Sequence, residues 1–290
     1  MKDKQKGESA LFSATILYGF FGIFSKLINF QLPIFYQAWV RNVFAFIVLG
    51  VVMILFKKWK PISLKDNVWF FFRSACGFVS FIGMYVAFTK LDIGTTYFLS
   101  YAASIVAGYV LGIFLFKEKI TRYGILAFVL SLMGLILVYK VDINSATFRY
   151  IVLAVLSGLA SPGWGAFSKK ISSTYSNLEL NFIDSLYAAA FPFVISLFIH
   201  EQWVPISFTK IWIYTFLFGL MFIVNGLLIV YGYSKVEAQT GTIILLFEII
   251  VGIILGYVVF HQVPPLGGFI GGGIILGAIL LRSFNKESAQ

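Results

Sequence analysis

The stretch TGTIILLFEIIVGIILGYVVF, residues 240–260, determines the fold class, because its only charged side chain is Glu248. A helix needs roughly 20 apolar residues to cross the hydrocarbon core of a bilayer. The strands of a membrane barrel would instead alternate polar and apolar residues over about ten positions. The stretch therefore predicts a transmembrane helix.

Nine other apolar runs of comparable length share the chain with it. They lie at approximately Ser9–Ile28, Ile34–Phe56, Val68–Thr89, Gly94–Phe116, Tyr123–Tyr139, Tyr150–Ser168, Leu180–Ile199, Ile211–Tyr233 and Leu266–Leu281. The composition agrees, since 60% of the chain is hydrophobic and only 12% is charged, against about 25% charged in soluble domains. We expect an all-α integral membrane protein with ten transmembrane helices. The linking segments are short, so function must reside within the helices.

The basic residues predict the orientation of these helices. With the N-terminus in the cytoplasm, fifteen basic residues fall on the cytoplasmic side: Lys2, Lys4, Lys6, Lys57, Lys58, Lys60, Lys65, Lys117, Lys119, Arg122, Lys169, Lys170, Lys235, Arg282 and Lys286. Only Lys90, Lys140, Arg149 and Lys210 fall on the far side. The positive-inside rule then places both termini in the cytoplasm, with the plasma (inner) membrane as the expected location. Because this rule accounts for the net charge of +10, nucleic acid is not needed as a partner.

An internal duplication divides the chain into repeats at residues 1–145 and 146–290. At an offset of 143, Gly22, Phe24, Ser25 and Lys26 align with Gly165, Phe167, Ser168 and Lys169. Each unit holds five spans, an odd number, so the second unit must enter the membrane in the opposite direction. Inverted repeats recur in transporters because two related halves can expose a central site alternately to each side. Duplication for stability alone is the other interpretation.

Three motifs resemble the drug/metabolite transporter superfamily, EamA type. They are AFTKLDIGTT at Ala87–Thr96, LFKEKIT at Leu115–Thr121 and LLFEIIVGIILGYVVF at Leu245–Phe260. The resemblance implies export or exchange of a small metabolite, amino acid-like or another small organic solute, through a central cavity and without nucleotide hydrolysis. Family members often carry proline in the middle of spans four and nine, where this chain has none. The acidic residue at the end of span four is present as Glu118, and its counterpart in the second half is Gln262.

Ionisable residues inside the spans are candidate pathway residues, because a mid-bilayer charge costs roughly 2.5–3.5 kcal/mol on insertion scales. Arg41 lies about 10 Å inside span two and either binds a substrate carboxylate, forms a structural ion pair or snorkels outward. Arg73 shares a face of span three with Gly77, Ser80 and Met84, and either lines an inner vestibule or anchors to headgroups. For Asp184 we expect an interhelical salt bridge. For Lys26 and Lys169 we expect interfacial anchoring.

Glu248 differs from the other candidates because it lies roughly 12 Å deep without a basic neighbour on its own helix. Burial disfavours the charged carboxylate, so Glu248 is the candidate coupling residue, as a proton carrier or as a ligand for a cationic group. The alternative is a protonated carboxyl that makes one interhelical hydrogen bond.

Uncharged polar residues complete the expected pathway. Tyr97, Ser100, Tyr101 and Ser104 recur at helical spacing and form one stripe of span four. Trp164 and Asn225 offer a ring surface and an amide, or alternatively ordinary packing and an interhelical hydrogen bond. Chemistry beyond transport has little support. Cys76 is the only cysteine and no Gly-Lys pair exists, so we expect no disulfide, metal, cofactor or phosphate loop. We expect a transporter or facilitator and not an enzyme, with a lipid flippase or scramblase, and then an intramembrane enzyme, as the alternatives.

Overall fold

The computed structural model describes residues 2–28, 31–56, 60–87, 90–91, 93–138, 148–261 and 266–284. Within these residues the chain forms helices and no strand. The elements in order are α1 Lys2–Gly19, α2 Phe21–Ile28, α3 Ile34–Leu55, α4 Leu64–Ala87, α5 Ile93–Phe116, α6 Arg122–Val138, α7 Phe148–Ala166, the 3-10 turn η2 Phe167–Lys170, α8 Asn177–Phe198, α9 Lys210–Lys235, α10 Ala238–Leu245, α11 Phe247–Phe260 and α12 Leu266–Phe284.

The expected spans correspond closely to these helices. Eight helical segments are long and apolar enough to cross a membrane, and α6 is a shorter apolar helix. The first expected span, Ser9–Ile28, is formed jointly by α1 and α2. The all-α prediction is therefore confirmed for the described residues, while the count of ten spans stays a prediction. Four of the lysines used for the orientation, Lys57, Lys58, Lys140 and Lys286, lie outside the described residues, as does Gln262.

Span nine is broken although it contains no proline. Helix α10 ends before Leu246 and α11 begins after it. The break is marked by tight i to i−3 bonds, from the Leu246 amide to the Ile243 carbonyl (3.1 Å) and from the Ile249 amide to the Leu246 carbonyl (3.0 Å). Such tightened turns inside a helix often mark functional hinges. Span four carries no such interruption, because α5 is continuous from Ile93 to Phe116.

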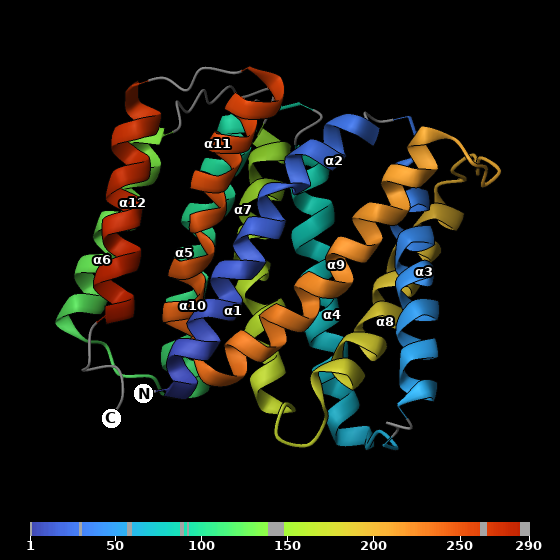
Figure 1. The fold of residues 1–290 in the computed structure, drawn as a ribbon, viewed down its shortest axis with the longest axis horizontal. Coiled ribbons are helices and arrows are strands. Elements are labelled where there is room, and N and C mark those ends of the chain that lie inside the picture. Colours follow the sequence, from blue (N-terminus) through green and yellow to red (C-terminus); the bar gives the residue numbers. More distant parts are fainter. Residues whose placement is uncertain are drawn as a thin grey trace.

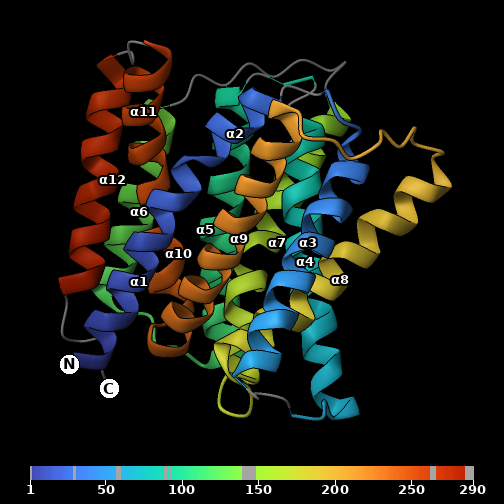
Figure 2. The same ribbon diagram turned by 45° about the vertical axis from the view of Figure 1, so that its right-hand side comes forward.

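Helix contacts between the two halves come in equivalent pairs, in which each helix is replaced by its counterpart from the other half. Helix α1 packs on α9 as α7 packs on α4, and α4 meets α8 as α9 meets α3. Helix α5 packs on α7 as α10 and α11 pack on α1. Two further pairs, α3 with α8 and α6 with α12, join equivalent spans of the two halves. These two pairs lie at opposite edges of the bundle (Figure 1). In the turned view, α8 leans away from the bundle toward its C-terminal end (Figure 2). The packing is that of two repeats related by a pseudo-twofold axis.

The first helices of the two halves run in opposite directions. The start of α1 meets the end of α9, where a Cβ at Gly7 would lie 2.6 Å from the Cβ of Lys235. The end of the α7–η2 segment reaches the same place, because Lys169 Nζ donates to the Val236 carbonyl at 3.0 Å. Helix α12 ends at the end of the bundle where α1 begins (Figure 1). This arrangement agrees with inverted repeats.

Aromatic side chains gather at the other end of the bundle. Tyr36 and Trp39 of α3 pack against Trp203 and Trp212, with ring centroids 5.3–6.0 Å apart. Glu201 accepts hydrogen bonds from the amides of Phe35 (3.1 Å) and Tyr36 (2.7 Å) and so caps the start of α3. Indole and phenol rings are enriched where a membrane meets water, so this cluster indicates one membrane interface.

Candidate functional site

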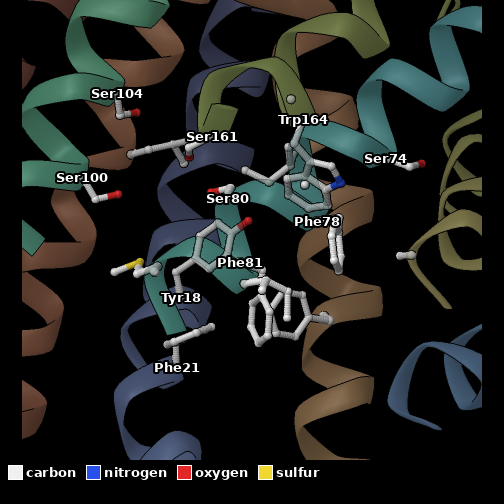
Figure 3. A pocket seen from close by; sticks show the side chains of 18 of the residues that line it. Tyr18, Phe21, Ser74, Phe78, Ser80, Phe81, Ser100, Ser104, Ser161 and Trp164 are labelled. Carbon is white, nitrogen blue, oxygen red and sulfur yellow. The ribbon is translucent and has the colours of Figure 1, made fainter. Parts of the chain in front are cut away.

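A cavity of about 190 Å³ lies in the interior of the bundle, between the two halves. Its lining comes from α1, α2, α3, α4 and α5 of the first half and from α7, α8, α9, α10 and α11 of the second. Figure 3 shows Ser100 and Ser104 on one side of it, Trp164 and Ser74 on the other, and Tyr18 between them. For scale, an engineered apolar cavity of about 150 Å³ binds one benzene molecule. The cavity therefore has the size of a small organic solute.

Six of the nine pathway residues expected from the sequence line this cavity. They are Arg41, Ser100, Tyr101, Ser104, Trp164 and Glu248. Gly77, Ser80 and Met84, the face expected to line an inner vestibule, also line it. The other three residues, Arg73, Tyr97 and Asn225, do not contribute to the lining.

Arg73 and Asp184 form a buried ion pair at the wall of the cavity. The Arg73 side chain is fully buried, and its Nη1 lies 2.5 Å from Asp184 Oδ2. Asp184 also accepts hydrogen bonds from Ser74 Oγ at 2.5 Å and from Trp164 Nε1 at 2.8 Å. The salt bridge expected for Asp184 is confirmed. The interpretation of Arg73 as a headgroup anchor is wrong, because its guanidinium points inward and lies 4.9 Å from the Trp164 ring.

Arg41 lies in an aromatic cage without an acidic partner. Its guanidinium carbon is 4.7 Å from the ring centroid of Phe81, 4.5 Å from that of Phe218 and 4.9 Å from that of Phe222. The residue is only 4% exposed, and no carboxylate of the described residues lies within ion-pair distance of it. Both the structural ion pair and the snorkelling interpretation are therefore wrong in this structure. The third interpretation, a substrate ligand, stays a proposal.

Glu248 lines the cavity in the first turn of α11, just after the break in span nine. The Tyr101 hydroxyl lies within hydrogen-bonding reach of its carboxyl. Broken membrane helices in transporters commonly direct half-helix ends toward substrate or coupling ions. The geometry thus places Glu248, a cavity carboxyl that no described lysine or arginine pairs with, at the break of span nine.

Of the four polar residues in the stripe on α5, three line the cavity and Tyr97 does not. Ser100 and Ser104 are 4% and 8% exposed, and both line the cavity with Tyr101. Tyr97 instead stacks on Tyr101, with centroids 5.4 Å apart. Helix α7 packs close behind Ser100, because a Cβ at Gly158 would overlap the Ser100 carbonyl oxygen. A larger residue at position 158 would force α5 and α7 apart.

Trp164 and Asn225 have different surroundings. The Trp164 ring lines the cavity, as expected for a ring surface, and its Nε1 also donates across helices to Asp184, which was not expected. Asn225 is fully buried in α9, and neither of its amide atoms has a hydrogen-bond partner among the described residues. The interhelical bond expected for Asn225 is therefore not made, and nothing in the structure explains its amide.

Several cavity residues were not expected from the sequence. Tyr18, Asn42, Tyr233 and Thr242 line the cavity, yet none of them belongs to a polar stripe at helical spacing. No local spacing distinguishes them from interfacial or packed residues. Only the three-dimensional convergence of α1, α3, α9 and α10 reveals their position.

A second polar network ties the helices together at the end where α1 begins. Glu118 accepts from the Ala238 and Gln239 amides at 2.6 and 3.1 Å, which caps α10, and pairs with Lys169 at 3.1 Å. The interfacial anchoring expected for Lys169 is therefore wrong, whereas the Lys26 side chain lies outside what the structure describes. Arg282 is fully buried and pairs with Glu237 at 2.7 Å. Burial raises the pKa of Glu237, with Arg282 acting in the opposite direction.

Cysteine accessibility tests which residues face the cavity. In a Cys76→Ala background, we expect Ser104→Cys to react with a small water-soluble methanethiosulfonate, because Ser104 lines the cavity. The matched control is Asn225→Cys, since Asn225 is 0% exposed and outside the lining. Labelling is read by mass spectrometry of intact protein. Equal labelling of the two variants would remove Ser104 from the pathway.

Comparison with known proteins gives one family and one fold. A sequence model described as the EamA-like transporter family matches residues 5–140 and again residues 148–284. No curated protein matches the chain. A solved structure, titled only as the crystal structure of a protein, superposes with a TM-score of 0.80 at 11% identity over 95% of this chain and 96% of that chain. At that identity the likeness concerns the fold alone.

Proposed function

Because the chain belongs to the EamA-like transporter family, we propose that it is a secondary transporter or facilitator that exports a small organic solute by alternating access. That the protein is a multi-pass membrane transporter follows from the family and the apolar helices. The solute class, the direction of transport and the alternating-access mechanism are proposed. We also propose that both termini face the cytoplasm at the plasma membrane, which impermeant labelling of terminal tags in intact cells would test.

The observation that carries the proposal is the cavity at the interface of the two halves. Its wall combines aromatic rings with a few polar groups and two ionisable groups, Arg41 and Glu248, that form no ion pair with any described residue. Binding sites for small solutes have this composition, with mostly apolar walls and few placed polar groups. Transporters built from inverted repeats hold such sites near the membrane midplane, at the interface of the repeats.

The pseudo-twofold packing supports alternating access. Since α1 with α9 and α4 with α7 are equivalent pairs, the two halves can exchange conformations with little change in energy. One exchange would close the cavity toward one side and open it toward the other. Two related packings of similar free energy are what such a cycle requires.

Purified protein in liposomes tests this function. We expect time-dependent uptake of a small organic solute from a screened panel, saturable and absent from protein-free vesicles. A fluorescent phospholipid in the same vesicles tests the flippase alternative, and we expect its transbilayer movement to match that of empty vesicles. If the lipid moved with the protein and no solute did, the solute-transporter proposal would be abandoned.

A further inference from the structure

The structure contains a buried arginine whose charge is not balanced by any described residue. Arg41 is 4% exposed, and its Nη1 has no hydrogen-bond partner. The other buried arginines differ, because Arg73 pairs with Asp184 and Arg282 pairs with Glu237. Leaving a buried charge without a counterion is costly. A counterion that arrives with the solute would remove that cost while it is bound.

The cage fixes the guanidinium without satisfying its donors. Phe81 of α4 and Phe218 and Phe222 of α9 surround it, and their faces attract the cation. Gly219 makes room for its stem, since a Cβ there would lie 3.0 Å from Arg41 Cγ. Rings supply no hydrogen-bond acceptor of carboxylate strength, so the N–H groups still need one. A guanidinium held in place is suited to bidentate recognition of a planar oxyanion.

The charges on the cavity wall limit the charge of the solute. Among the lining residues only Arg41, Asp184 and Glu248 carry charge in their ionised forms. Asp184 is neutralised by Arg73. When Glu248 carries a proton, the cavity therefore has one net positive charge. A monoanion balances this charge, whereas a phosphate dianion would leave an unpaired negative charge in the membrane interior.

The rest of the wall indicates the body of the solute. Tyr18, Phe21, Phe78, Phe81 and Phe222 contribute aromatic surface to the wall, and the ring centroids of Phe81 and Phe222 lie 4.7 and 4.9 Å from the Arg41 guanidinium carbon. The volume of about 190 Å³ exceeds that of a cavity of about 150 Å³ that binds benzene. A ring or a short branched chain with one carboxylate fits this space.

From these observations we infer that the solute class is a small organic monocarboxylate and that Arg41 binds its carboxylate while the aromatic wall packs against its apolar body. This inference rests on the proposed transport function, because it names the substrate of the same cavity. It makes Arg41 a specificity-determining residue.

Benzoate and benzamide are suitable probes, because they share a ring and differ in charge. We expect detergent-purified protein to bind benzoate about 10- to 100-fold more tightly than benzamide, measured by titration calorimetry, since a charge-assisted pair contributes that much. Arg41→Gln should abolish the preference. Arg41→Lys keeps the positive charge but loses the two parallel N–H donors of the guanidinium, so its preference for benzoate over benzamide should be intermediate. Arg149→Gln, an exposed arginine outside the cavity, should behave as wild type.

Several outcomes would overturn the inference. They are equal binding of the two probes by wild type, binding of neither, a benzoate preference that survives Arg41→Gln in monodisperse protein, and tighter binding of phenyl phosphate than of benzoate. Failure of the transport function looks different. If benzoate binding depended on Arg41 but no solute entered liposomes, the transport function would be wrong and the carboxylate site would stand. If solute uptake were unaffected by Arg41→Gln, the carboxylate site would be wrong and the transport function would stand.

Discussion

The Asp184→Asn variant should lose about 3–5 kcal/mol of folding stability, the usual cost of removing one partner from a buried ion pair. The physical reason is the Arg73 guanidinium, which is fully buried and lies 2.5 Å from Asp184 Oδ2. Asparagine has a single acceptor oxygen, which can replace Oδ2 as the acceptor for Trp164, while its amide nitrogen would donate to the Ser74 hydroxyl in place of Oδ1. Both side-chain contacts can therefore be kept, and the lost charge dominates. Thermal unfolding of detergent-purified protein, followed by tryptophan fluorescence, measures the effect as a lower transition temperature.

A double-mutant cycle separates the ion pair from other consequences of the substitution. Arg73→Gln alone should also destabilise, because it leaves the Asp184 carboxylate buried without its cation. The double variant Arg73→Gln/Asp184→Asn should be more stable than the sum of the single effects predicts, since no buried charge remains. Asp3→Asn, an exposed carboxylate at the start of α1, serves as the control. Strict additivity of the two single effects would show that the residues do not interact.

The pair also shows where sequence reasoning ends. Hydropathy placed the spans because membrane insertion depends on local apolar length, which is a property of consecutive residues. The choice of Asp184 as a salt-bridge partner also succeeded, because a carboxylate inside a span requires one. Its partner could not be identified, because the sequence does not show which side chains of neighbouring helices meet. Whether Asp184 meets Arg41 or Arg73 depends on the rotation of α3, α4 and α8 about their axes. Hydropathy gives the length of each helix and not the face that it turns toward its neighbours.

The break at Leu246 was missed for a related reason. Expectation of a kink in span nine depended on proline, and the chain has Leu246 and Phe247 at the junction of α10 and α11. Helix α10 is capped by Glu118 from the end of α5. The start of span nine is therefore fixed by tertiary contacts, and residues close in sequence contain no signal for it. The depth of Glu248 could be predicted, and its position at a hinge could not.

Glu248 is the acidic residue whose removal should change transport most. It lines the cavity in the first turn of α11. The titratable side chains that face it are tyrosines: Tyr101 and Tyr97 of α5 and Tyr18 of α1. No described lysine or arginine forms an ion pair with it. Its charge can therefore change only by proton binding or by contact with a cationic group of the solute.

Glu248→Gln keeps the size and hydrogen bonding of the side chain and removes its titration. If Glu248 carries one proton together with each solute monoanion, wild-type protein in liposomes should accumulate solute up to about tenfold per unit of pH gradient, since one pH unit corresponds to 1.36 kcal/mol. The variant should reach only equal concentrations on both sides, with normal folding. Glu8→Gln, an acid of α1 outside the cavity lining and paired with Lys4 at 3.7 Å, should accumulate solute as wild type does.

The three roles considered for Glu248 give different results in the same assay. If the Glu248 carboxyl only accepts a hydrogen bond from Tyr101, glutamine can replace it, because it accepts the same hydrogen bond. The transport rate and its pH dependence would then both persist. A ligand for a solute cation would lose affinity at every pH, and the pH gradient would still drive accumulation at saturating solute. A proton carrier would lose the response to the gradient while downhill movement continued. Unchanged accumulation and unchanged pH dependence in Glu248→Gln would therefore end the coupling proposal, whereas a ratio that stays at one for any gradient would support it.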